Sequence, residues 1–187
     1  MHARLAEVMD FLERKREALL QSFTGVAPEP MRRRVSDEAW SVAEIIDHLR
    51  LVETSVAQLL SKRASDARAR GIGEEGSTES VLSSLDHLAI EADNTFMEAP
   101  SIVRPRPFVD AGDAIIGLDE SRKALRAAAA SASGLALGEI KQKHFSFGEL
   151  DLYQWLVFLG QHEGRHTRQI QRTLTATRAG DGALTHR

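Results

Sequence analysis

The sequence contains no cysteine, so disulfide bonds, thiolate metal ligands and a cysteine nucleophile are all excluded. Apolar runs are short as well, and none approaches the ~18–20 residues that a membrane-spanning helix requires. The N-terminal stretch MHARLAEVMDFLERKREALL is charged throughout and lacks the apolar segment of a signal peptide. These absences favour a cytoplasmic protein that does not insert into a membrane.

An excess of one charge sign is also absent, because 24 lysines and arginines stand against 27 aspartates and glutamates, for a net charge of -3. Nucleic-acid-binding proteins usually carry a broad basic surface, and the short run Arg32–Arg34 is better explained as a solvated loop. We therefore expect no nucleic-acid partner. The 187 residues, 42% of them hydrophobic, suffice for one domain with a buried core. We expect this domain over residues 1–176 and a mobile tail over 177–187.

Apolar residues recur at helical spacing along most of the chain. One helix start is marked by a capping box, in which Ser41 is the N-cap and Glu44 follows three residues later. The segment 133–149 is expected to be a loop, and no convincing strand pattern appears. The sequence therefore predicts an all-α protein, a four-helix bundle with long crossover connections. The predicted helices cover 3–23, 42–68, 113–133 and 149–176, with a weaker helix over 79–93.

The last predicted helix carries two histidines on its inward face. An i, i+4 pair of imidazoles can hold one metal ion from adjacent helical turns. The stripe is apolar at both ends, so both histidines should point toward the bundle centre. The residues that form this stripe at intervals of three or four are Trp155, Leu159, His162, His166, Ile170 and Leu174.

A third ligand should come from another helix, and His48 is the best candidate because it follows the inward-facing Ile45 by three residues. His87 lies in a weaker helix and His144 in a predicted loop, so both are poorer candidates. A buried histidine is often only a structural core residue that has a hydrogen-bond partner. Burial without a partner costs about 1–3 kcal/mol for each polar group. Both interpretations remain open, a divalent metal site and a structural role.

The letters HEGRH also match the H-E-x-x-H signature of zinc proteases. Zinc proteases of this kind need a third ligand, usually downstream, yet only 21 residues follow His166 and none is glutamate. The extended form of the motif requires glycine where this chain has Gln169, and no sheet is evident to hold a peptide substrate. A protease is therefore disfavoured. Glu163 could approach a metal-bound water, but a surface pair with an arginine is the favoured expectation.

Three segments together resemble the DinB-like superfamily, in particular its DinB_2 branch. They are WSVAEIIDHLRLVE (40–53), EAPSIVRPRP (98–107) and HFSFGELDLYQWLVFLGQHEGRHTRQI (144–170). The resemblance covers nearly the whole chain and implies a four-helix bundle with up-down-down-up connectivity, often as a homodimer. It also implies a divalent metal held by His48, His162 and His166, with the remaining coordination positions open.

Characterised members of the family that the chain resembles include thiol-dependent S-transferases and a mycothiol-dependent isomerase. The resemblance thus implies a low-molecular-weight thiol and a small electrophile as substrates. Nitrogen ligands suit Zn or Ni, and such an ion lowers the pKa of a bound thiol or water. The alternative is a non-catalytic metal-binding or stress-associated module that binds a small ligand. No residue is assigned a catalytic role.

Several neighbouring residues invite smaller predictions. Arg165 and Arg168 could steer an anionic cosubstrate, although solvated helix charges explain them as well. Gln169 and Glu44 are candidates for hydrogen bonds to the ligand histidines. Gly160 and Gly164 lie four residues apart inside a helix, where glycine is unfavourable, so we expect them to allow a close approach of another helix around the site.

Overall fold

Over the described residues, 1–92 and 98–184, the computed structural model contains four long helices packed as a bundle, as the periodicity predicts. The predicted boundaries agree within two residues at most helix ends. The exception is the last helix, which continues past the predicted end at 176. Residues 185–187 of the predicted mobile tail lie outside the described residues. The four long helices are α1 (Ala3–Phe23), α3 (Val42–Ala69), α4 (Ala111–Ala132) and α5 (Leu152–Leu184).

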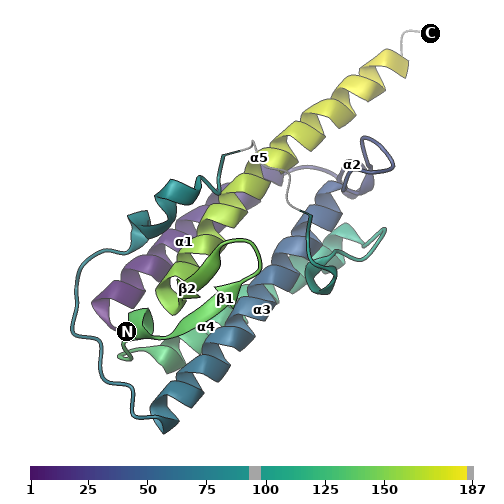
Figure 1. Ribbon diagram of the computed structural model, residues 1–187. Coiled ribbons are helices and arrows are strands. Elements are labelled where there is room, and N and C mark those ends of the chain that lie inside the picture. The colour runs from purple at the N-terminus through teal and green to yellow at the C-terminus, as the bar shows by residue number, and fades with distance from the viewer. Residues whose placement is uncertain (93–97, 185–187) are drawn as a thin grey trace.

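The helix directions confirm the up-down-down-up arrangement. In Figure 1, α1 and α5 run toward the upper right, whereas α3 and α4 run the opposite way. Because α3 and α4 point in the same direction, the chain between them must return along the length of the bundle. This return accounts for the long crossover over residues 70–110, which includes the 3-10 helices Leu82–Leu88 and Ser101–Val103.

Side-chain hydrogen bonds cap the N-termini of α3 and α4. The predicted capping box is present: Ser41 accepts a hydrogen bond from the Glu44 N–H at 3.2 Å, and the Glu44 carboxylate accepts one from the Ser41 N–H at 2.8 Å. At α4, the Asp110 carboxylate accepts hydrogen bonds from the N–H groups of Gly112 and Asp113. Such caps satisfy donors that have no partner within the helix. A short helix, α2 (Pro28–Arg32), precedes α3.

Two connections differ from the prediction. The weak helix expected over 79–93 is a 3-10 helix over Leu82–Leu88. The loop expected over 133–149 contains the 3-10 helix Leu137–Glu139 and an antiparallel hairpin of β1 (Lys141–His144) and β2 (Gly148–Asp151). Each strand is only four residues long, so its alternation is too short to stand out from the surrounding sequence.

A polar layer crosses the middle of the bundle between two hydrophobic clusters of the described residues. Each long helix contributes apolar side chains to both clusters: α1 gives Leu12 to one and Leu19 to the other. Where the two clusters meet along the bundle, buried polar side chains separate them. We use the name polar layer for Arg16, His48, Glu53, Ser121, Arg122, His162, Glu163 and His166.

Among the described residues, no helix is both long and apolar enough to cross a membrane.

Candidate metal centre

The structure brings together the three histidines that the sequence predicts. His48 comes from α3, while His162 and His166 lie one turn apart on α5, and all three are buried. The Nε2 atom of His162 is 3.4 Å from Nε2 of His48 and 3.1 Å from Nε2 of His166. One ring nitrogen from each residue lies within 4.8 Å of the others, a grouping that could hold a metal ion.

Hydrogen bonds on the far side of two rings fix their orientation. Nδ1 of His48 is 2.7 Å from the carbonyl oxygen of Val103, which can only accept, so this nitrogen carries the proton. Nδ1 of His166 likewise lies 2.7 Å from the side-chain oxygen of Gln169. In both rings Nε2 is therefore left with its lone pair directed toward the third histidine. Contacts of this kind orient metal-binding histidines in proteins.

Glu44 and Gln169 were both candidates for supporting the histidines, and only the contact of Gln169 is present. The Glu44 carboxylate instead caps α3 and accepts hydrogen bonds from the Arg34 side chain and the Phe108 N–H. Glu44 therefore joins the start of α3 to the segment before α4.

Burial keeps the three imidazoles neutral. Removal from water lowers the pKa of His48, which its hydrogen bond to Val103 partly opposes. Burial and the neighbouring histidines hold the pKa of His162 well below its usual value. Burial and His48 lower the pKa of His166 to about 3. Neutral imidazole is the form that binds a metal, so the site presents its ligands in the required state near neutral pH.

The spacing of the nitrogens fits a metal ion. Zn–N bonds of about 2.0–2.1 Å in a tetrahedral site place ligand nitrogens about 3.3 Å apart. The two Nε2 separations in this cluster, 3.4 and 3.1 Å, lie on either side of that value. With Nε2 of His162 unprotonated as well, three neutral nitrogens at this spacing would suit a cation. The ligand role of the three histidines nevertheless remains a prediction.

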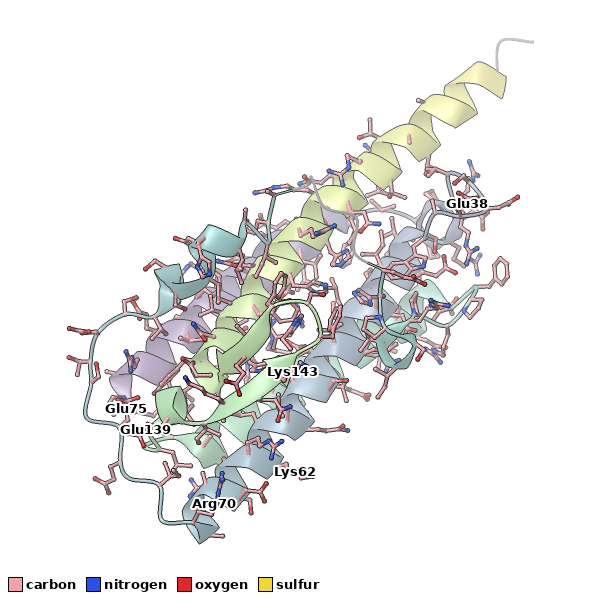
Figure 2. All side chains as sticks on the ribbon, viewed as in Figure 1. Glu38, Lys62, Arg70, Glu75, Glu139 and Lys143 are labelled. Atoms are coloured by element: carbon pink, nitrogen blue, oxygen red, sulfur yellow. The ribbon has the colours of Figure 1, made fainter. Side chains whose placement is uncertain are left out.

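A pocket of about 910 Å³ opens onto the histidines. Part of its wall is aromatic: the Phe158 ring lies with its centroid 5.2 Å from that of His162, and Trp155 packs beside Phe158. The rim also carries charged residues, including Arg165 and Glu38. Figure 2 shows Glu38 in the connection before α3, at the end of the molecule opposite Glu75 and Glu139. The site thus combines three buried histidine rings with an open pocket.

The structure gives His144 a larger role than the sequence suggested. It ends β1, is buried and lines the pocket, with its ring centroid 4.7 Å from that of Phe158. Its Nδ1 accepts hydrogen bonds from the N–H groups of Ser146 and Phe147. Burial lowers its pKa to about 4, so the ring is neutral near pH 7. The alternating H-F-S-F letters before a glycine could have indicated a hairpin and thereby an ordered His144.

Glu163 does pair with arginine, but the expected surface location is wrong because the side chain is buried. Its carboxylate accepts a hydrogen bond from Arg122 at 2.9 Å and another from Arg16. Successive residues on a helix point about 100° apart. While His162 faces α3, Glu163 therefore faces the arginines of α1 and α4. Glu163 has no place in the pocket wall, which removes it as a protease-like base.

Arg16, Arg122, Glu53 and Glu163 form a closed ionic cluster beside the histidines. Arg16 donates to Glu53 at 2.9 Å, and Arg122 donates to Glu53 at 2.6 Å. The Ser121 hydroxyl also donates to Glu53. Two positive and two negative groups cancel within this cluster, which joins α1, α3, α4 and α5.

The two arginines that follow the histidines on α5 differ in their surroundings. Arg165 lines the pocket, whereas Arg168 is an exposed residue that pairs with Glu91. A Cβ at Gly160 would lie 2.2 Å from the Phe11 ring, and one at Gly164 would lie 2.9 Å from the Glu91 side chain. Gly160 therefore permits the close helix approach that the sequence suggested, whereas the neighbour of Gly164 is a side chain from the crossover.

A helix bundle with a buried polar layer and an inward histidine triad defines the class of this protein. Comparison with known families identifies the family: residues 12–170 match the DinB superfamily, so the chain belongs to it. It is 30% identical over 160 residues to the uncharacterized protein YuaE of Bacillus subtilis (strain 168), covering 83% of this chain and 91% of that protein.

The fold is also similar to a solved structure, described as the crystal structure of TT2238, a four-helix bundle protein. The two structures superpose with a TM-score of 0.60 over 90% of this chain and 98% of the other, at 20% sequence identity. At that identity, the likeness supports the fold alone.

Proposed function

We propose that the protein binds one divalent transition-metal ion, Zn or Ni, through His48, His162 and His166, and uses it to transfer a small thiol to an electrophile. The observation that carries the proposal is the convergence of three neutral imidazole nitrogens at the base of an open pocket. Membership of the DinB superfamily and the buried histidine group are both compatible with metal binding.

The chain's own residues would bind and orient the reactants. A divalent cation held by neutral ligands keeps its full charge and would lower the pKa of a thiol beside it. The aromatic wall around Phe158 and Trp155 suits the apolar body of an electrophile. Arg165 lies where it can attract an anionic group on either substrate.

The proposed reaction is a substitution at carbon. The thiol gives up its proton to solvent, and a sulfur electron pair forms the new carbon–sulfur bond. The bond from that carbon to its leaving group breaks at the same centre, and the electron pair departs with a halide. With an epoxide, it departs to the ring oxygen, which then takes a proton. The reaction needs no oxidant or reductant.

A panel assay tests this function. Metal-loaded protein is incubated with several low-molecular-weight thiols and a chlorinated or epoxide acceptor, and thioether formation is followed by mass spectrometry. We expect metal-dependent product with at least one thiol, and none with the His48→Ala, His162→Ala or His166→Ala variants. Metal-loaded protein that forms no thioether with any pair would refute the transferase proposal.

A second function, a metal-binding module without catalysis, is favoured by one observation: the triad joins α3 to α5 inside the polar layer. A metal there would cross-link two helices, as structural sites do. Thermal melts with and without a chelator separate the two functions. A metal needed for the fold lowers the melting temperature strongly on removal, whereas a catalytic metal leaves a folded but inactive protein.

We also propose that the protein is a homodimer, as its resemblance to dimeric family members implies. Exposed apolar side chains, Phe108 and Ile116 near the start of α4 and Ile102 just before it, offer surface for such contact. Light scattering coupled to size-exclusion chromatography measures the mass directly, and a value near the 20.6 kDa of one chain would contradict the dimer.

A further inference from the structure

One ring nitrogen of the triad has no hydrogen-bond partner in the described part of the chain. Nδ1 of His48 contacts Val103, and Nδ1 of His166 contacts Gln169. Nδ1 of His162 is buried and has no hydrogen-bond partner among the described residues. A buried polar nitrogen of this kind costs about 1–3 kcal/mol, and histidines that bind metals almost always engage their second nitrogen. The central member of the triad is therefore the one that lacks an orienting contact.

A small cavity of about 10 Å³ borders this histidine. Its polar lining consists of His162, Arg16, Glu53 and Glu163, so it lies between the triad and the ionic cluster. This size corresponds to about one water molecule, and a buried water typically makes about three hydrogen bonds. The cavity thus has both the room and the polar neighbours that an ordered water needs.

The two carboxylates of the ionic cluster that line the cavity retain unused hydrogen-bonding capacity. A carboxylate oxygen can accept two hydrogen bonds. Oε1 of Glu53 accepts one, from Arg122, and Oε1 of Glu163 accepts one, from Arg16. Each of these oxygens can therefore accept a further hydrogen bond from a water molecule without giving up its arginine.

We propose that one ordered water occupies this cavity and bridges Nδ1 of His162 to the carboxylate of Glu53 or Glu163. The water accepts the Nδ1–H of His162 and donates to the carboxylate, which leaves Nε2 of His162 unprotonated and directed at the metal position. Glu53 and Glu163 are then positioning residues, which act on the metal through His162. The effect on metal binding rests on the proposed function, whereas the bridge itself does not.

A crystal structure of the full chain at high resolution tests the bridge directly. We expect a water peak within about 3.2 Å of both His162 Nδ1 and a carboxylate oxygen. The test requires no bound metal and no assay of activity. A cavity that holds no water, or one in which His162 Nδ1 reaches a different partner, would overturn the proposal.

The positioning role needs a variant that removes the water and keeps the fold. Glu53→Gln and Glu163→Gln both disturb the ionic cluster, so loss of folding would obscure their effect. Val52→Ile adds one carbon to a residue that lines the cavity and leaves every polar group in place. Val56→Ile is the matched control, because Val56 lines the large pocket but not the cavity.

Metal affinity, measured by competition with a chromogenic chelator, provides the readout. We expect Val52→Ile to displace the water and to weaken metal binding about 10–100-fold, the usual effect of losing an orienting partner. Val56→Ile should bind like the wild type. If Val52→Ile loses the water and binds metal as tightly as Val56→Ile, the positioning role is wrong. Wild-type protein that binds no metal would refute the proposed function, while the water peak still decides the bridge.

Discussion

The polar layer has two halves that differ in how their buried groups are satisfied. In the ionic half, Arg16 and Arg122 meet Glu53 and Glu163, so donors face acceptors and the charges cancel. In the histidine half, His48, His162 and His166 turn basic nitrogens toward a common point. Buried polar groups that satisfy one another hold a fold together. Ring nitrogens that converge beside an open pocket could hold a cation, and this difference makes the histidine half, rather than the ionic half, the candidate binding site.

The largest effect is expected from breaking the ionic half. Arg122→Ala should destabilise the protein by about 3–5 kcal/mol, because it leaves two buried carboxylates, Glu53 and Glu163, with only the single charge of Arg16 to balance them. Arg126→Ala is the control: Arg126 lies on the same helix in an exposed pair with Glu13, and its loss should cost about 0.2–1 kcal/mol. Denaturant unfolding measures both, and equal losses would show that burial of the cluster contributes nothing.

Substituting a histidine of the triad should abolish metal binding, while the protein stays folded. We expect His166→Ala to weaken metal binding by more than about 100-fold, the upper range for loss of an orienting partner alone. His87→Ala, a histidine outside the triad, should keep the wild-type metal content. Elemental analysis after dialysis provides the measurement. Unchanged metal content in His166→Ala would mean that the metal binds elsewhere or not at all.

Helix α1 packs closely against α5 at Gly160. Gly160→Ala should destabilise the protein by about 1–3 kcal/mol, because the added Cβ meets the Phe11 ring at 2.2 Å. Gly164→Ala should cost less, since the flexible Glu91 side chain can move away. Thermal unfolding compares the two variants, and a reversed order would indicate that α1 adjusts more easily than Glu91.

The last effect is confined to acidic pH and concerns His144, a buried histidine outside both halves. Its folded pKa, about 4, lies below the ordinary value of 6.5, so the unfolded chain binds more protons between these values. Its contribution to stability is therefore complete above pH 6.5 and is lost as the pH falls from 6.5 toward 4. His144→Phe should reduce the slope of stability against pH in this window, to which the three buried histidines of the triad also contribute. An unchanged slope would assign that pH dependence to other groups.

The sequence alone determined the long helices and the identity of the triad. Helical spacing is a property of a single segment, so the stripe through His162 and His166 can be placed on the inner face of α5 without knowledge of the other helices. The capping box at Ser41 is equally local. The inward position of His48 follows from the same periodicity on α3. All of these features depend on residues within a few positions of one another.

Only the tertiary structure decided which side chains surround the triad. The burial of Glu163 depends on Arg16 and Arg122, which come from helices distant in the chain, and periodicity cannot match such positions. The order of His144 depends on a hairpin whose strands are too short to recognise and on aromatic packing against α5. A helical pattern reports which face of a helix a residue lies on but not which residue it meets, so these partners could be assigned only once the helices and the hairpin were placed in space.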